Sequence, residues 1–153
     1  MAQEQDNSLG EMNAYLRTEL PLTTAMGIEV TAWDGQVVTL GAPLGPNLNH
    51  ADTAFGGSIA ALGILAGYTL LYLVLRERGV SNKLLIQRSE VDFVRPIITD
   101  LRATAHLPPA EELEAFVESV QRRRRGRVEV LSEVWSGGMV GARHRGLYIA
   151  ILY

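Results

Sequence analysis

The residues whose types could support chemistry gather in one short stretch, 47–58, directly before a long apolar run. The polar members of this stretch come first, and Gly56 and Gly57 lie where the apolar helix is expected to begin. Backbone N–H groups at a helix start, left accessible by glycine, can donate to a carbonyl oxygen that becomes negative during acyl transfer. Gly56 and Gly57 are therefore candidate oxyanion donors. The alternative is that they only let the helix and a sheet pack closely.

Asp52 is the carboxylate nearest to this helix start. An ionised carboxylate can deprotonate water or attack an acyl carbon directly. An aspartate just ahead of a helix is also a favoured N-cap, so the sequence leaves a catalytic role and a capping role open. His50 is a candidate general base, with a structural hydrogen bond as its alternative.

Other polar side chains offer weaker signals. Asn47 and Asn49 could orient water or a substrate, although asparagine in a loop rich in glycine and proline also serves turns. A basic run is expected at the end of a short helix, where cations complement the helix dipole; it comprises Arg122, Arg123, Arg124 and Arg125. Guanidinium groups also match phosphate oxygens, such as those of coenzyme A, so this run is a candidate phosphate site.

Glu90 and Asp92 alternate with Arg88 along a predicted strand, which is typical of a solvent-facing row of ion pairs, with a cleft or a subunit contact as the alternative.

Composition excludes several function classes. The chain has 153 residues, no cysteine and a formal net charge of −3, which suits a reducing cytoplasm and gives no general attraction for nucleic acid. Its three histidines lack the spacing of metal ligands, so no metal site is expected. A phosphate-binding Gly-rich loop and a Gly-x-Ser-x-Gly nucleophile motif are both absent. The sequence therefore predicts chemistry without a cofactor.

The uncharged stretch from Ala54 to Leu75 is long enough to span a membrane, and Gly63 and Gly67 match a spacing found in membrane helices. It also contains polar residues, and amphipathic segments on both sides need something apolar to cover. We therefore expect a buried core helix and no membrane, with a span as the minor alternative.

The remaining elements follow from periodicity and turn residues. Residues 1–8 are expected to be loose, with Ser8 capping a helix that ends at Pro21. The other predicted elements are a hairpin of 28–33 and 37–40, strands 83–95 and 99–107 paired antiparallel, a short helix from Pro109, and strands 128–135 and 139–153.

This order, strand pairs separated by one helix that is apolar on nearly all sides, predicts an α+β fold in which an antiparallel sheet curls around the helix. At this level the chain resembles the hot-dog superfamily over residues 26–153. The chain length predicts a single domain, 1–153, in which residues 1–25 form a helical N-terminal extension of the hot-dog core.

The loop 47–58 resembles a family of hot-dog thioesterases that also occurs C-terminal to some bacterial N-acetyltransferase domains. The matching pattern is Asn-x-Asn-His-x-x-Thr-x-Phe-Gly-Gly-Ser, and the later run Phe-Val-Arg-Pro-Ile at 93–97 is also similar. Asp52 departs from the pattern, which more usually has a small residue there. The resemblance implies hydrolysis of an acyl-CoA or acyl-carrier-protein thioester. The residues carried over beside Asp52, Gly56 and Gly57 are Asn47, Asn49, His50, Thr53, Phe55 and Ser58.

Two other functions remain open. A hydratase or dehydratase of similar fold uses a carboxylate inside the central helix, and 54–75 has none. A noncatalytic module that binds acyl-CoA would need only the pocket. A helix apolar on every side also leaves surface for a partner, so we expect a homodimer or a dimer of dimers.

Overall fold

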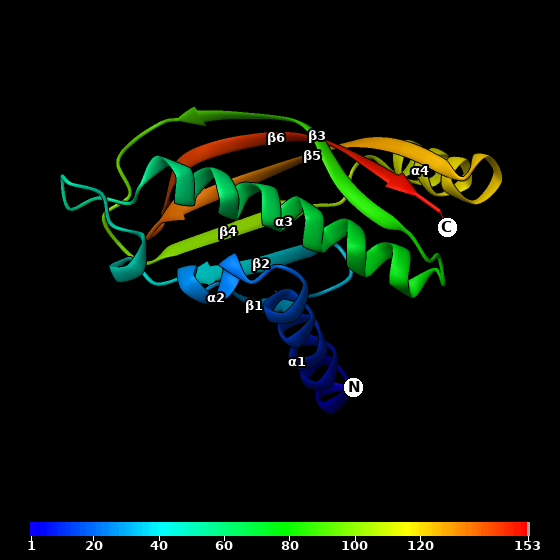
Figure 1. The fold of residues 1–153 in the computed structure, drawn as a ribbon, viewed down its shortest axis with the longest axis horizontal. Helices are drawn as coiled ribbons and strands as arrows, with labels where there is room; N and C mark the ends of the chain where they lie inside the picture. Colours follow the sequence, from blue (N-terminus) through cyan, green and yellow to red (C-terminus); the bar gives the residue numbers. More distant parts are fainter. Residues whose placement is uncertain (153) are drawn as a thin grey trace.

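The computed structural model describes residues 1–152 and contains one six-stranded antiparallel sheet in the order β1-β2-β4-β5-β6-β3 (Figure 1). Tyr153, the last residue of the predicted strand 139–153, lies outside the described residues. In chain order the elements are α1 (Ala2–Glu19), α2 (Leu22–Met26), β1 (Glu29–Trp33), β2 (Val37–Ala42), the short 3₁₀ helix η1 (Gly45–Asn47), α3 (Gly56–Glu77), β3 (Lys83–Phe93), β4 (Leu101–His106), α4 (Ala110–Arg123), β5 (Arg125–Ser136) and β6 (Met139–Ile151).

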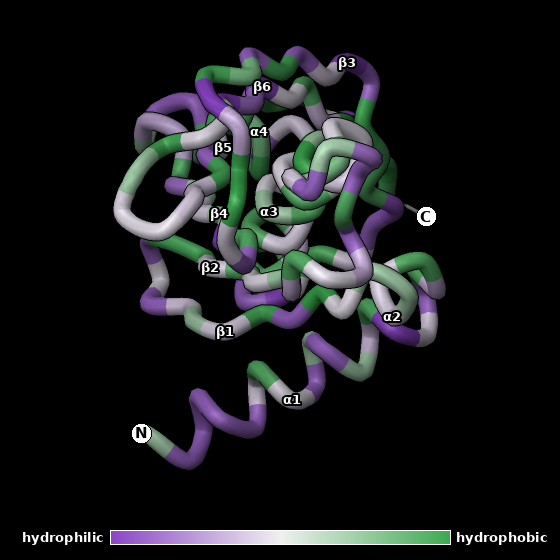
Figure 2. The backbone as a smooth tube through the Cα atoms, turned by 90° about the vertical axis from the view of Figure 1, so that its left-hand side faces the viewer, coloured by the Kyte–Doolittle hydropathy of each residue, from purple (hydrophilic) through white to green (hydrophobic). Residues whose placement is uncertain are grey.

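The sheet curls around α3, as the end-on view in Figure 2 shows. By length and composition α3 could cross a membrane, but 61% of its most apolar window is buried inside this fold. Fully buried side chains such as Leu62, Leu70 and Leu75 come from several sides of the helix. The predicted α+β fold with a curled sheet around a long apolar helix is confirmed, and the wrapping explains why α3 has no polar face.

Glycine allows α3 to approach β6 closely. A methyl group on Gly63 would lie 2.9 Å from Cβ of His144, and one on Gly67 would lie 2.7 Å from Cζ of Tyr148. The Tyr148 hydroxyl donates to the carbonyl oxygen of Ile64 at 2.7 Å, so helix and strand are also hydrogen-bonded. The spacing of small residues in α3 therefore serves helix-to-sheet packing.

One predicted strand pairing is wrong. The strand at 83–93 does not pair with the next strand, because β3 pairs with β6 and β4 lies between β2 and β5. The connection between them is not a tight turn: Ile97 in it is fully buried, and its carbonyl oxygen accepts from the N–H of Ala54 at 2.8 Å. This contact draws the connection past the start of α3, so that the two strands enter the sheet at separate places.

The N-terminal prediction is also wrong, because α1 begins at Ala2 and Ser8 lies inside it instead of capping it. No glycine or proline interrupts residues 2–8, so the helical ladder can extend to the start. α1 packs along β1 through Asn13, whose Nδ2 donates to the carbonyl of Val30 at 3.0 Å while its Oδ1 accepts from the Val30 N–H at 2.7 Å. Met12 and Leu16 beside it are fully buried.

The close approach at Gly67 yields a stability prediction. We expect Gly67→Ala to lower the free energy of unfolding by ~1–3 kcal/mol, because the added methyl overlaps a buried, hydrogen-bonded tyrosine. Gly10→Ala is the matched control: it lies in α1 with nothing within 4 Å of the added carbon, and should raise that free energy by ~0.5–1 kcal/mol. Urea unfolding of both variants measures the difference. Equal effects would contradict the packing role of Gly67.

Candidate functional site

The start of α3 has no side-chain cap. Phe55 occupies the N-cap position, no side chain among residues 1–152 bonds to the first turn, and the first helical bond runs from the Ile59 N–H to the Phe55 carbonyl at 3.1 Å. The N–H groups of Gly56 and Gly57 precede that bond, at the positive end of the helix dipole. Gly57 is exposed and Gly56 half-buried. These two N–H groups can thus reach a ligand oxygen.

The glycines at 56 and 57 are not needed for close packing on the sheet. A methyl on Gly56 would meet the Phe93 ring at an ordinary 3.6 Å, and one on Gly57 would overlap only the exposed ring of Phe55. The close-packing alternative therefore applies to the two glycines further along α3.

Asp52 does not cap α3, which corrects the capping interpretation. Asp52 lies in a turn with φ 58°, three positions before the N-cap Phe55. Two backbone hydrogen bonds hold the residues that follow Asp52. The Phe55 N–H donates to the Asn47 carbonyl at 2.7 Å, and the Ala54 N–H donates to the Ile97 carbonyl. The Asp52 carboxylate is therefore exposed at the tip of the loop and is not used by the helix.

Asn49 shapes this turn. Its Oδ1 accepts from the N–H groups of Ala51 at 2.8 Å and Thr53 at 3.1 Å, and its Nδ2 donates to the Thr53 hydroxyl at 2.8 Å. The turn leaves His50 exposed. The side chains of Asn49 and Thr53 thus hold the loop that carries Asp52, and their predicted contacts with a substrate remain predictions.

Asn47 lies below the surface at 2% exposure. Its Nδ2 donates to the carbonyls of Met26 at 2.9 Å and Pro43 at 2.8 Å, which joins α2 to the loop that follows β2. Ser58, one position after the two glycines, is also buried. Asn47 thus has a structural task, and its contact with a substrate stays a prediction.

Two exposed aromatic rings flank the start of α3. Phe55 is 56% exposed and Phe93, from β3, is 58% exposed. A methyl group added to Gly57 would lie nearest to the Phe55 ring, and one added to Gly56 would lie nearest to the Phe93 ring. An apolar surface therefore adjoins the free N–H groups, which is an arrangement suited to a ligand with a carbonyl group and a hydrocarbon chain.

The arginine run lies far from this site within one chain. α4 ends at Arg123, Arg124 has φ 62°, and Arg125 begins β5, so the predicted place at a helix C-terminus is confirmed. Arg125 pairs with Ile151 at one end of β6, whereas Phe93 pairs with Ala142 near the other end. At ~3.3 Å per residue the two ends are separated by about 30 Å. α4 and the start of α3 lie at opposite ends of the fold in Figure 1.

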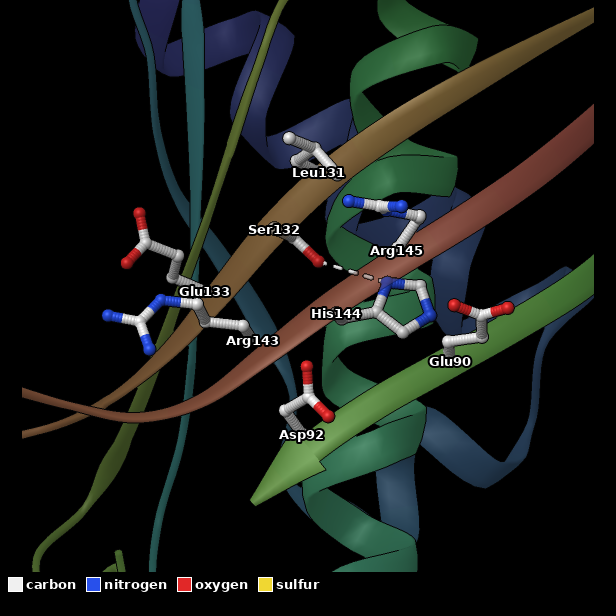
Figure 3. Close-up of a pocket in the computed structure, with 8 residues that line it drawn as sticks. All are labelled: Glu90, Asp92, Leu131, Ser132, Glu133, Arg143, His144 and Arg145. Atoms are coloured by element: carbon white, nitrogen blue, oxygen red, sulfur yellow. Dashed lines mark hydrogen bonds between the residues drawn. The ribbon is translucent and has the colours of Figure 1, made fainter. Parts of the chain in front are cut away.

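The structure shows a second polar cluster, which the sequence analysis missed, around His144 on β6. His144 is 2% exposed; its Nε2 lies 2.7 Å from the Ser89 hydroxyl and its Nδ1 3.2 Å from the Ser132 hydroxyl (Figure 3 shows the latter bond). Burial lowers the pKa of His144 to about 4. The period-two pattern of β6, in which His144 shares a face with Ala142 and Tyr148, is the signal that could have revealed it.

The opposite face of the same strands is charged. Glu90 pairs in register with Arg145 and Asp92 with Arg143, around a shallow hollow of about 410 Å³ (Figure 3). Arg145 also lies 3.6 Å from Glu129. Arg88, Glu90 and Asp92 are exposed, as predicted for a solvent-facing row, but the ion pair found on this face is the exposed one between Arg145 and Glu129, which contributes little to stability.

The YiiD_C family, described as "Putative thioesterase (yiiD_Cterm)", matches residues 9–152. The chain belongs to this family. The match includes the loop 47–58, the whole of α3 and both polar clusters.

Solved structures similar to this YiiD_C protein share its fold. A protein of unknown function from Chlorobaculum tepidum is 24% identical with a TM-score of 0.93, covering 97% of each chain. A "putative thioesterase" from Shewanella oneidensis is 21% identical with a TM-score of 0.87, covering 95% of this chain and 99% of the other. A "probable thioesterase" from Pseudomonas aeruginosa is 18% identical with a TM-score of 0.78, covering 94% and 95%. The hot-dog fold is thereby established.

The buried imidazole predicts acid sensitivity. Because the pKa of His144 is about 4 in the folded protein and about 6.5 when unfolded, the unfolded chain binds a proton more readily. Stability is therefore complete above pH 6.5 and falls as the pH drops toward 4, by about 2–3 kcal/mol at pH 4.5. Urea unfolding from pH 7 to pH 4.5 measures this loss.

His144→Gln should flatten that profile whatever its effect at pH 7, and His106→Gln, at an exposed position, should leave it unchanged. An unchanged slope in His144→Gln would contradict the assignment.

Proposed function

We propose that this YiiD_C protein hydrolyses acyl thioesters, with acyl-CoA as the substrate. The observation that carries the proposal is the uncapped start of α3, where the accessible N–H groups of Gly56 and Gly57 adjoin exposed aromatic rings. Membership of a thioesterase family supports the choice of reaction.

In the proposed reaction the thioester carbonyl oxygen accepts hydrogen bonds from the N–H groups of Gly56 and Gly57. Water attacks the carbonyl carbon, and Asp52 takes a proton from that water. The negative charge that develops on the oxygen is stabilised by the two donors and by the helix dipole. The C–S bond then breaks, and the thiolate receives the proton to leave as free thiol. The acyl chain lies against Phe55 and Phe93.

A panel of acyl-CoA esters and acyl-carrier-protein thioesters, assayed for released thiol, tests the reaction directly. Release from either carrier identifies the substrate source. If no thioester is cleaved but several raise the melting temperature, the protein is a binding module, because stabilisation by mass action needs no catalysis.

Gly56 allows a test of the oxyanion donors. Gly56→Pro removes one N–H at the first helical position, where proline is tolerated, and the extended backbone of Phe55 (φ −64°, ψ 132°) suits a residue before proline. We expect kcat to fall by ~10²–10³ while the fold is retained. Gly56→Ala keeps the N–H and fits sterically, so its kcat should change much less. Equal losses in both variants would contradict an oxyanion role for Gly56.

Asp52→Asn tests the base. Asparagine adopts positive φ as readily as aspartate, so the loop should keep its shape while turnover falls by ~10²–10⁴. Thiol release and melting temperature are measured together, with Asp6→Asn, an exposed carboxylate of α1, as the control. An active Asp52→Asn would return attention to His50 and Asn49.

We also propose that the protein is a homodimer or a dimer of dimers. Ala61 and Leu65 lie on a side of α3 that the sheet leaves half-buried, whereas Tyr68 and Tyr72 further along the same side contact Tyr15 of α1. A second copy covering Ala61 and Leu65 would bury apolar surface. Light scattering should therefore find a species heavier than the 16.7 kDa chain, and a stable species of that mass would contradict the proposal.

A further inference from the structure

We propose that the arginine run at the end of α4, residues 122–125, binds the phosphate groups of an acyl-CoA molecule whose thioester lies at the start of α3 of the other subunit. Each site then combines the first turn of α3 from one chain with the arginine run of its partner. The inference rests on the proposed homodimer and on acyl-CoA as the substrate.

Within one chain the arginine run is too far from the start of α3 for one substrate arm to span. The two ends of β6 that pair with Arg125 and with Phe93 are separated by about 30 Å. The arm of coenzyme A between the thioester sulfur and the first phosphate is about thirteen bonds long, which corresponds to about four residues of extended chain, or about 15 Å. A thioester held at Gly56 therefore cannot place its pyrophosphate at the arginine run of the same chain.

The edge of the sheet at β3 is where a second copy brings the two features together. β3 is 11 residues long, contains no proline and has no neighbour on its outer side within the described sheet. Its outer N–H and C=O groups can therefore pair with another strand. Arg88 and Glu90 are both exposed. When two β3 strands pair antiparallel about a twofold axis at Ser89, each Arg88 lies opposite Glu90 of the other copy, which is a favourable cross-strand pair.

This register places the partner's arginine run near the start of α3. Phe93 lies opposite the partner's Leu85, because the two positions are equally far from the axis. Within each chain Leu85 pairs with Ile149, and Ile149 pairs with Arg127. Three strand spacings therefore separate Phe93 from the partner's Arg127, which is about 14 Å, and Arg125 begins the same strand two residues before. This distance matches the length of the coenzyme A arm.

The arginine run has the charge and the fixed backbone that a phosphate site needs. All four side chains are exposed. Among the described residues an ion pair is found for Arg122, with Glu118 at 3.1 Å, and for none of the other three. The turn that carries these three is held by a hydrogen bond from the Leu152 N–H to the Arg124 carbonyl at 2.9 Å. Guanidinium groups form paired hydrogen bonds with phosphate oxygens, so an exposed group of them on a fixed turn suits a pyrophosphate.

Replacement of two arginines tests the phosphate contact. Arg124→Gln combined with Arg125→Gln removes charge-assisted hydrogen bonds and should weaken the binding of free coenzyme A, measured by calorimetry, by ~10–100-fold. Arg17→Gln combined with Arg145→Gln is the matched control, because it removes the same charge from exposed positions on α1 and β6 and should bind like the wild type. The KM for an acyl-CoA ester should rise by the same factor in the first variant. The KM for the N-acetylcysteamine thioester of the same acyl group, which carries no phosphate, should stay unchanged.

Hybrid dimers test which subunit supplies the arginines. A Gly56→Pro chain and a chain with both Arg124→Gln and Arg125→Gln are co-expressed with different affinity tags and purified through both tags. In a shared site, the intact Gly56 of one chain meets the intact arginines of the other, so the hybrid should cleave acyl-CoA with the wild-type KM. A hybrid with only the raised KM of the arginine variant would overturn the proposal, because each chain would then use its own arginine run.

Unchanged coenzyme A binding in the variant with both Arg124→Gln and Arg125→Gln would also overturn the proposal, as would equal rises in KM for the two thioesters. A wild-type protein that cleaves neither thioester would contradict the proposed hydrolysis. The calorimetric comparison of the two double variants then decides the inference, so the two failures are distinguishable.

Discussion

The contact of α3 with β5 and β6 is the constraint on which the rest of the structure depends. Helix and sheet can come this close only because Gly63 and Gly67 lack side chains. Two hydroxyl groups, from Ser132 and Tyr148, then bond to helix carbonyls that already belong to the helical ladder. Apolar burial alone would not prevent α3 from shifting along its axis or rotating against the sheet. These directional bonds fix both its axial position and its rotation.

The fixed helix determines what its first turn can do. The loop before α3 is joined to the β3–β4 connection through Ala54 and Ile97 and to α2 through Asn47. The N-cap position is occupied by Phe55, whose side chain has no hydrogen-bonding group, and no other side chain of the described residues caps the helix. The N–H groups of the first turn are thus held in place by their surroundings and left open to solvent. Preorganised donors of this kind need no rearrangement when charge appears on a ligand.

Much of this arrangement follows from local sequence patterns. Hydropathy and length identify α3, and turn residues identify the β1–β2 and β5–β6 hairpins. Strand order does not follow, because alternation shows which face of a strand is buried but not which strand lies beside it. The pairing of β3 with β6 depends on a connection held by Ile97, a contact between distant parts of the chain.

The same limit applies to the two polar sites. The loop 47–58 is contiguous, so its residue types could be interpreted together. The turn that keeps Asp52 away from the N-cap position of α3 could not be foreseen. Ser89, Ser132 and His144 come from three strands and meet only in the folded sheet. Alternation places His144 on a buried face, but its partners are visible only once the strand order is known.

The double hydrogen bond between Asn13 and Val30 has a consequence for assembly. An amide that offers one donor and one acceptor to a strand's backbone takes the place of a neighbouring strand, so α1 closes the β1 end of the sheet. In the part of the chain that the structure describes, only the β3 end of the sheet remains able to add strands. Two sheets joined there about a twofold axis would have no open end left. Edge-to-edge growth of this protein is thus self-limiting at a pair, and indefinite β-polymers would first require α1 to detach.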